Sequence, residues 1–231
     1  MARRKRNQKK ADETLVDIVE VRDSAQNFLD DNQNYIFGAL VVLVVVIGGL
    51  FAYNNFYKKP RQREAVEQVF RAQEQFERDS FALALTNPGG GYPGFLDVIS
   101  KYKGTPAANS ARFYAGISYL NLGNYEAAVD YLKQFKPVGD IAPITKYGAL
   151  GDAYSELNDF DAAMKNYKKA AAQGDNEVLT PYYLKKIGLL HERNGNAGEA
   201  LKVYQQIKDK YPDSSVGRDI QKYIARVSAK G

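Results

Sequence analysis

The sequence predicts an all-α protein, in which one N-terminal transmembrane helix is followed by a superhelix of stacked helical pairs, an α-solenoid. Three observations lead to this fold class: residues 36–53 carry no charge, apolar residues after residue 58 recur at helical spacing, and a unit of 35 to 37 residues repeats after residue 95. About 170 of the 231 residues follow the apolar stretch, which is enough for one sizeable domain.

Residues 1–34 are interpreted as a cytoplasmic tail with an amphipathic segment. The tail opens with a cluster of basic residues: Arg3, Arg4, Lys5, Arg6, Lys9 and Lys10. Such a cluster is typical of a solvated, disordered tail, and it also suits attraction to anionic lipid headgroups or ribosomal RNA. The apolar residues of Leu15–Leu29 fall on a helix-like face, which predicts an amphipathic segment near the membrane or against a partner. Asp30–Asn34 is expected to form a polar break before the apolar stretch.

The stretch Ile36–Tyr53 is expected to cross a membrane, within a span that includes the flanking aromatics at residues 35–57. Its 18 residues would rise ~27 Å as an α-helix, close to the hydrocarbon thickness of a bilayer. Lys58 and Lys59 end the run with charges that are costly to bury in lipid. A buried core helix would keep a polar face, and a cleaved signal peptide would lie nearer the N-terminus with a small-residue cleavage site, so neither alternative is favoured.

Residues 58–94 are interpreted as a linking helix and a loop that include a degenerate first repeat. Apolar residues at helical spacing over Lys58–Thr86 predict one helix, with Pro60 near its start, where a missing N–H is tolerated. Asn87–Gly94 (NPGGGYPG) is the strongest cluster of chain breakers and predicts a loop. A phosphate-cradling P-loop would need a preceding strand and a following Gly-Lys-Ser/Thr, and the sequence has neither here.

Helical repeats are predicted for residues 95–214, with a capping helix at residues 215–231. Glycines recur at Gly116, Gly151 and Gly188, spaced by 35 and 37 residues. Alanine follows each glycine at the twelfth position, and a large residue follows at the sixteenth: Leu132, Tyr167 and Tyr204. The small residues would let the two helices of a pair approach closely, and the aromatics would fill the space between successive pairs. Because one pair cannot bury its apolar face alone, the pairs are expected to stack.

These residues resemble the tetratricopeptide repeat, a helix–turn–helix unit of about 34 residues. The stretch AGISYLNLGNYEAAVDYL has the small Gly116, the aromatic Tyr119, a turn at Gly123-Asn124-Tyr125 and the small Ala128. GDAYSELNDFDAAMKNYKKA follows the same pattern, whereas the third unit has His191 and Ala197 at two aromatic positions. The resemblance implies a tetratricopeptide-repeat superhelix and a role in binding partner proteins.

Residues for catalysis are scarce, so we do not expect an enzyme, a cofactor or a metal site. The chain has no Cys and one His, which excludes disulfides, thiolate metal sites and Cys nucleophiles. His191 occupies a repeat position that Tyr119 and Tyr154 fill elsewhere, and we expect it to pack in the core. The net charge of +5 is mild and mixed with acids, which argues against a nucleic-acid partner. Two acidic pairs are expected at solvated positions: Asp159 with Asp161, and Asp152 with Glu156.

The repeat resemblance also implies a concave groove, lined by the first helix of each pair, that accepts peptides or partner helices. By register, the groove positions of the first unit are Ser110, Phe113, Ile117, Leu120 and Asn121. Those of the second unit are Thr145, Asp152, Ser155 and Glu156. Those of the third unit are Tyr182, Lys185, Leu189, Glu192 and Arg193. The expected groove is apolar at one end and charged at the other.

The order of basic tail, amphipathic segment, single span and repeats resembles the YfgM-type inner-membrane proteins of bacteria, which are ancillary subunits of the Sec translocon. This resemblance implies the bacterial inner membrane, a cytoplasmic N-terminus and a periplasmic repeat domain. The implied partners are the SecYEG translocon, a PpiD-like membrane-anchored chaperone, exported client proteins and the lipid bilayer. A cell-envelope scaffold that organises another membrane complex is the alternative from a different class.

The charges beside the span favour a different topology from the one that the layout implies. Within about 20 residues of the span, Arg22 is the basic residue on the N-terminal side. On the C-terminal side the basic residues are Lys58, Lys59, Arg61, Arg63 and Arg71. The positive-inside rule, applied to these residues, would place the repeats in the cytoplasm as a membrane-tethered adaptor. The basic cluster within residues 3–10 supports the opposite orientation, and we give the layout more weight.

Overall fold

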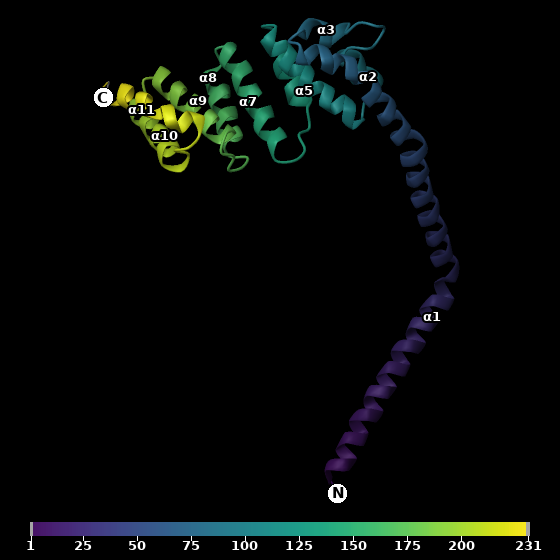
Figure 1. Ribbon diagram of the computed structural model, residues 1–231. Coiled ribbons are helices and arrows are strands. Elements are labelled where there is room, and N and C mark those ends of the chain that lie inside the picture. Colours follow the sequence, from purple (N-terminus) through teal and green to yellow (C-terminus); the bar gives the residue numbers. More distant parts are fainter. Residues whose placement is uncertain (1, 230–231) are drawn as a thin grey trace. The chain divides into compact units, whose positions relative to one another are not determined.

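The computed structural model describes the backbone of residues 2–229 and the side chains of residues 22, 24 and 26–229. Every regular element in this part of the chain is a helix, which confirms the predicted all-α class (Figure 1). The chain forms two compact units, Met1–Lys59 and Pro60–Gly231, and each is described separately.

The first unit consists of α1 (Ala2–Ala52) and the π-helical segment η1 (Tyr53–Lys58). The polar break predicted at Asp30–Asn34 is wrong, because α1 continues through it. The side-chain amide of Asn32 donates to the carbonyl of Phe28, 2.9 Å away and one turn earlier, so this polar residue bonds within the helix instead of interrupting it. The apolar face predicted for Leu15–Leu29 lies largely outside the described side chains, but Phe28 and Leu29 are exposed.

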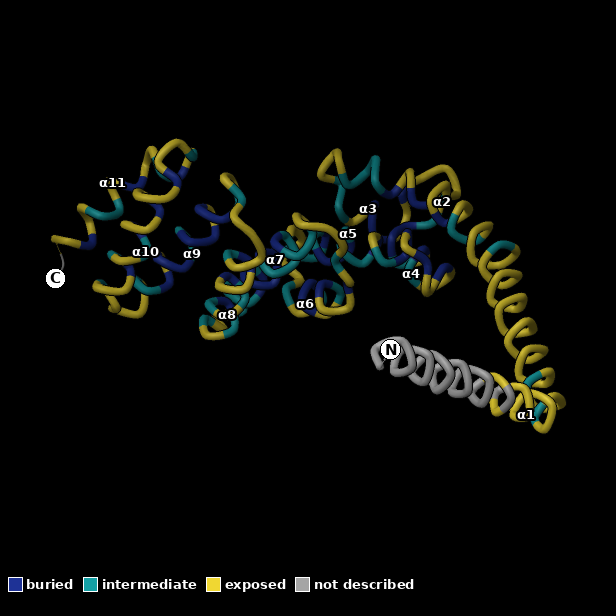
Figure 2. Tube along the Cα trace, turned by 90° about the horizontal axis from the view of Figure 1, so that it is seen from below, coloured by how far each residue is buried: buried dark blue, intermediate teal, exposed yellow. Residues whose placement is uncertain are grey.

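A helix that is long and apolar enough to cross a membrane runs over Gln26–Glu77, and its most apolar window is wholly unburied. Figure 2 colours the described part of α1 as exposed along nearly its whole length. The helix does not end at the aromatic residues that follow the apolar stretch. The Tyr53 and Tyr57 rings stack there with centroids 5.2 Å apart, and Lys59 donates to the side chain of Asn55 over 2.7 Å.

The second unit begins with three helices, α2 (Lys59–Glu77), α3 (Phe81–Thr86) and α4 (Phe95–Lys101). The single helix predicted over residues 58–86 is therefore wrong in part. It is interrupted at Asp79, which has a φ of 56°, a left-handed conformation that aspartate tolerates better than most residues. The predicted loop at Asn87–Gly94 is confirmed. Phe76 of α2 packs edge-on against Tyr114, which lies in the helix that follows α4 in the chain, with ring centroids 5.0 Å apart.

Three helical pairs and a last helix complete the second unit, and neighbouring helices follow one another in a row (Figure 1). The pairs are α5 (Pro106–Asn121) with α6 (Tyr125–Gln134), α7 (Ile141–Glu156) with α8 (Phe160–Ala171), and α9 (Leu179–Arg193) with α10 (Ala197–Lys210); α11 (Ser215–Ser228) follows. The turn inside each pair contains one residue with a positive φ: Gly123, Asn158 and Gly195. Asn124 and Asp159 then cap the second helices of their pairs by accepting from a backbone N–H, over 3.3 and 3.0 Å.

The repeated glycines mark the closest approaches within the pairs. A Cβ added to Gly116 would lie 2.6 Å from Cγ of Leu132, and one added to Gly151 would lie 2.4 Å from Cδ1 of Tyr167. At Gly188 the nearest atom would be Cε1 of Tyr204, at 2.2 Å. In each pair the large residue sixteen positions later fills the space that the glycine leaves, which confirms the predicted role of the small residues.

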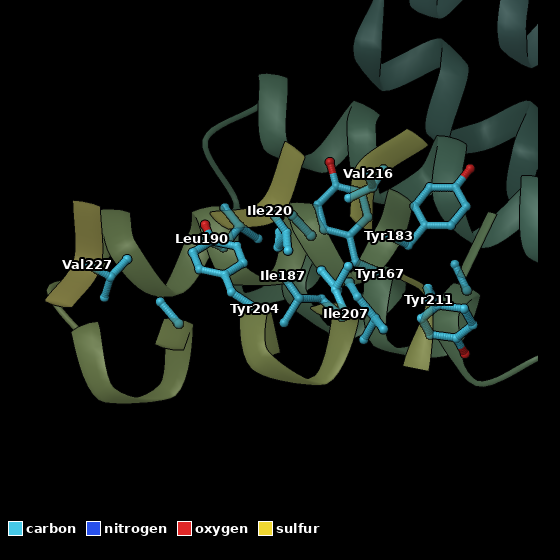
Figure 3. Close-up of a cluster of buried hydrophobic side chains, with 14 of the residues drawn as sticks. Tyr167, Tyr183, Ile187, Leu190, Tyr204, Ile207, Tyr211, Val216, Ile220 and Val227 are labelled. Carbon is cyan, nitrogen blue, oxygen red and sulfur yellow. The ribbon is translucent and has the colours of Figure 1, made fainter. Parts of the chain in front are cut away.

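The C-terminal part of the unit has the most extensive core (Figure 3). Tyr204 and Ile207 of α10 are fully buried there, packed with α9 and with Ile220 of α11. Helix α11 buries Val216, Ile220 and Val227 and leaves its other face exposed. This one-sided burial is what a capping helix at the end of a stack of repeats requires.

Candidate partner-binding groove

The first helices of the three pairs, α5, α7 and α9, line a shared hollow of about 430 Å³. Five of its lining residues are among the predicted groove positions: Leu120, Asp152, Ser155, Glu156 and Leu189. Four further lining residues were not predicted: Tyr125 of α6, Tyr167 of α8, and Lys186 and Leu190 of α9. The structure therefore brings predicted residues from all three repeats together at one place.

The floor of the hollow is a hydrogen-bonded group of three side chains. The carboxylate of Asp152 accepts from the hydroxyl of Tyr167 over 2.7 Å and from the ammonium of Lys186 over 2.5 Å. Asp152 was expected at a solvated position and is instead half-buried. Since each charge has an opposite partner, the floor is electrically balanced, which a partly desolvated site requires.

Burial and charge set the protonation of this floor. Burial raises the pKa of Tyr167, and the negative charge of Asp152 raises it further, so the hydroxyl stays protonated and acts as a donor. Burial acts to lower the pKa of Lys186, but Asp152 and Tyr182 outweigh it, and the pKa is raised overall. The ammonium also lies 4.9 Å from the centroid of the Tyr182 ring, a cation–π contact.

The rim of the hollow is mixed. Leu189 is 38% exposed and Leu120 is half-buried, so both offer apolar surface to a ligand. Glu156 is exposed at the end of α7, and its negative charge raises the pKa of the Tyr125 hydroxyl. An occupant would therefore meet leucine side chains beside a solvated carboxylate, which suits a peptide segment carrying both apolar and cationic or hydrogen-bond-donating groups.

The remaining predicted positions of α5 and the first turn of α7 lie outside this hollow. Phe113 and Ile117 pack on the core between α5, α6 and α7, and the Phe113 ring lies 5.2 Å from that of Phe135. The side chains of Asn121 and Thr145 donate to carbonyls of their own helices, over 2.9 Å and 3.1 Å. Ser110 is exposed near the start of α5.

The charged positions predicted on α9 hold the C-terminal helices together. The carboxylate of Glu192 accepts from the Tyr204 hydroxyl and from the Arg226 guanidinium, each over 2.6 Å. The guanidinium of Arg193 stacks 3.5 Å from the centroid of the Phe160 ring. Lys185 lies near the rings of Tyr182 and Tyr223, at 6.0 and 5.9 Å. Of these predicted residues, Tyr182 is the one that joins the groove floor, through Lys186.

Two of the four residues that register missed, Tyr167 and Lys186, were missed for different reasons. Tyr167 occupies the sixteenth position after Gly151, which the sequence marked as a packing position, and its ring does pack while its hydroxyl faces the groove. Lys186 precedes the α9 glycine by two residues, where the other first helices have Tyr114 and Ala149. No periodic signal distinguishes such a residue, and only its pairing with Asp152, 34 positions earlier, reveals its place.

Nothing in the described residues offers a metal site, since no three His, Cys, Asp or Glu side chains cluster there. Asp159 of the first acidic pair caps α8. His191 is half-buried with its Nδ1 enclosed, and burial lowers its pKa, with the nearby Lys168 acting in the same direction. These contacts agree with a packing position for His191.

Two family models described as the tetratricopeptide repeat match the chain, over residues 110–136 and 149–215. A comparison with curated proteins gave no match. Among solved structures, the chain is similar to the crystal structure of nearly identical TPR-like repeats of a candidate kinesin light chain from Podosopora anserina, with a TM-score of 0.56 and 15% identity. That alignment covers 74% of this chain and 87% of the other. A single-residue variant of the same repeats gives a TM-score of 0.56 and 15% identity, and its alignment covers 75% of this chain and 89% of the other.

These comparisons support a tetratricopeptide-repeat protein with an α-solenoid fold. The matched segments include parts of all three pairs and every residue that lines the hollow. Repeats of this kind are in general non-catalytic modules for protein–protein interaction, and their concave surface is the usual place of contact.

Proposed function

We propose that this chain is a non-enzymatic, membrane-anchored subunit whose repeat groove binds a segment of a partner protein. The observation that carries the proposal is the hollow shared by α5, α7 and α9, where leucine side chains lie beside a balanced polar floor. The apolar helix over Gln26–Glu77 supports the anchor. The two together describe a protein that holds a binding surface at a membrane.

The chemistry of the groove defines the occupant. Leu120, Leu189 and Leu190 would take an apolar side chain, and the exposed Glu156 would pair with a Lys or Arg of the partner. The hollow can take part of a longer chain segment, since it lies along the first helices of three successive pairs. A short amphipathic segment with an apolar and a basic residue one or two turns apart fits this description.

The assembly that we propose is the bacterial Sec translocon, on the strength of the layout that resembles YfgM-type proteins. The anchor would lie in the inner membrane with the repeats in the periplasm. The groove would bind a PpiD-like chaperone or the exported clients themselves. A stoichiometric scaffold of another envelope complex is the second candidate, and it would use the same groove with one fixed partner.

Binding to purified SecYEG in nanodiscs, with and without an exported client chain, tests this proposal. The full chain would be compared with a Leu189→Glu, Glu156→Lys variant, which reverses both features of the rim. We expect the variant to bind at least about tenfold more weakly, because an apolar contact and a charge pair are lost together. The matched control is Gln205→Glu, Asp209→Lys, which makes the same change in net charge at exposed residues of α10 outside the hollow.

Equal binding by the wild type and the groove variant would exclude the groove as the binding surface. Binding to one fixed envelope protein, with none to the translocon or its clients, would favour the scaffold. Topology needs its own measurement, protease treatment of intact spheroplasts that carry a tag after Gly231. Digestion from outside supports periplasmic repeats, whereas protection until lysis would mean a cytoplasm-facing adaptor, as the basic residues after the span suggest.

A further inference from the structure

A second hollow, of about 310 Å³, lies on the opposite face of α7. Its walls come from α6, α7 and α8, and they carry four lysines: Lys133, Lys146, Lys165 and Lys169. Asp152 of the groove and Tyr154 of this hollow are two residues apart, or about 200° around the helix. The two sites are therefore separated by the body of one helix.

The charges of this second hollow are not balanced as those of the groove are. Among the described residues, none of the four ammonium groups forms an ion pair with a carboxylate. The carboxylate of Asp130 raises the pKa of Lys133, but by less than the hydroxyl of Tyr154 does. The lining residues include no Asp or Glu. Four like charges share a small space without a counter-charge from the protein.

The positions of these lysines are fixed by contacts that leave their charge uncompensated. Lys146 is half-buried and donates to the carbonyls of Lys133 and Phe135, over 3.2 and 2.5 Å. Burial lowers the pKa of Lys146, and the positive charge of Lys169 lowers it further, which means that the two ammonium groups repel each other. The ammonium of Lys169 lies 5.2 Å from the Tyr147 ring centroid.

Lys133 is held in a similar way, 5.6 Å from the ring centroid of Tyr154. The two tyrosine rings thus place one ammonium each against the wall of the hollow. Lys165 and Lys169 are exposed at its edge on α8. An anion that entered would meet ammonium groups from three helices, without requiring the chain to rearrange.

We propose that this hollow binds a phosphate group, delivered either by a soluble phosphate compound or by an anionic lipid headgroup. Lysine ammonium groups act on phosphate as point charges with several donors each, and several of them can share the oxygens of one phosphate group, as a diester or in a diphosphate. The volume lies at the small end of ligand pockets, which fits a headgroup or a diphosphate and not a large organic molecule. Binding would relieve the repulsion between the four lysines.

Calorimetric titration of the full chain, held in neutral detergent free of phosphate, tests the proposal. One arm uses inorganic pyrophosphate, and the other uses a short-chain phosphatidylglycerol with the phosphatidylcholine analogue as the neutral comparison. The test variant is Lys165→Gln, Lys169→Gln, which removes two exposed charges and leaves Lys146 in place. The control is Lys168→Gln, Lys208→Gln, which removes the same charge from exposed positions outside the hollow.

We expect saturable binding that weakens by about tenfold or more in the test variant and stays near wild type in the control. Binding of pyrophosphate alone assigns the site to soluble phosphates, and binding of phosphatidylglycerol with the same dependence on the variant assigns it to lipid headgroups. Absence of saturable binding in both arms would overturn the proposal. Equal losses in the two double variants would also overturn it, because the effect would then come from net charge alone.

Discussion

The two faces of α7 show how one helix of a repeat can serve two different kinds of surface. On the groove face, Asp152 neutralises Lys186 and accepts from Tyr167, so the polar atoms are satisfied by the protein. On the other face, Lys146 and Lys169 lie together without a carboxylate between them. The floor of the groove is therefore complete without a charged ligand, whereas the lysines on the other face would gain stability from an anion. The difference suggests different ligands, an amphipathic peptide on one face and a phosphate group on the other.

The difference between the faces arises at single positions of the repeat. The residue after the repeated glycine is Asp152 in the second unit, but Ile117 and Leu189 in the units on either side. The residue five positions before the glycine is Lys146, where the other units have Ala111 and Tyr183. The shared framework fixes where these side chains lie, and individual substitutions decide what each face binds.

The largest change in stability is expected from Tyr167→Ala, which removes one of the three side chains that form the floor of the groove. The Tyr167 ring is buried against Gly151, and its hydroxyl donates a hydrogen bond to Asp152. The variant therefore leaves a cavity and removes one of the donors to the Asp152 carboxylate. We expect a loss of about 3–5 kcal/mol in the free energy of unfolding, measured by urea denaturation. Tyr154→Ala, on the half-buried lysine face, should lose clearly less. Equal losses would show that the two faces do not differ in packing.

A smaller loss is expected from Lys186→Met, which leaves Asp152 without its ion pair. Both side chains are about one-quarter exposed, so water replaces part of the lost interaction. The expected loss is about 1–2 kcal/mol. A double-mutant cycle with Asp152→Asn measures the coupling between the two residues. The double variant should regain part of the stability lost in Lys186→Met, because the unpaired carboxylate is then removed. Additive losses would contradict a direct interaction between the two residues.

On the opposite face, adding a negative charge should stabilise the protein. Lys165→Glu introduces the counter-charge that the four lysines lack, and we expect a gain of a few tenths of a kcal/mol, as for other exposed charge pairs. The gain should vanish in about 1 M salt, where charges on the surface are screened. Thermal unfolding at low and high salt provides the measurement. A loss of stability at low salt would mean that the lysines do not repel one another appreciably.

The smallest change in stability is expected at His191, whose position in α9 corresponds to that of Tyr154 in α7. Its pKa is lowered by burial and then by Lys168, while Glu199 opposes the shift. The folded state therefore takes up the proton less readily than the unfolded state, whose pKa is near 6.5. Stability that is present above this pH is lost as the pH falls through the folded-state pKa. His191→Phe should show a flatter stability profile below pH 6.5 than the wild type; parallel profiles would contradict the assignment.

Periodicity predicted the parts of the fold that depend on repeated small residues. The glycines at 116, 151 and 188 located the close helix approaches, because each close approach excludes a side chain. The continuity of α1 through Asp30–Asn34 was not predicted, since polar residues at helix interiors and in loops look alike until their hydrogen bonds are known. The interruption at Asp79 was missed for a related reason, because a residue other than glycine seldom adopts a positive φ.

Register predicted part of the groove and missed the rest. Leu120, Asp152 and Leu189 lie on first helices and face the hollow, as expected. Glu192 lies on the same helix as Leu189, but its carboxylate forms an ion pair with Arg226 of α11. The position of a residue in the repeat does not predict such an interaction. The lysine hollow was not predicted either, because its four lysines lie on three helices and are each ordinary surface residues in sequence.

Site-specific photo-crosslinking of the full chain in native membranes tests the central claim most directly. One photoreactive residue would replace Leu189 in the groove, and another would replace Lys165 at the edge of the lysine hollow. We expect discrete protein adducts from position 189, lost in the Glu156→Lys background, and none from position 165. Protein adducts from position 165 with none from position 189 would contradict the account, because the partner would then bind the face that we assign to phosphate.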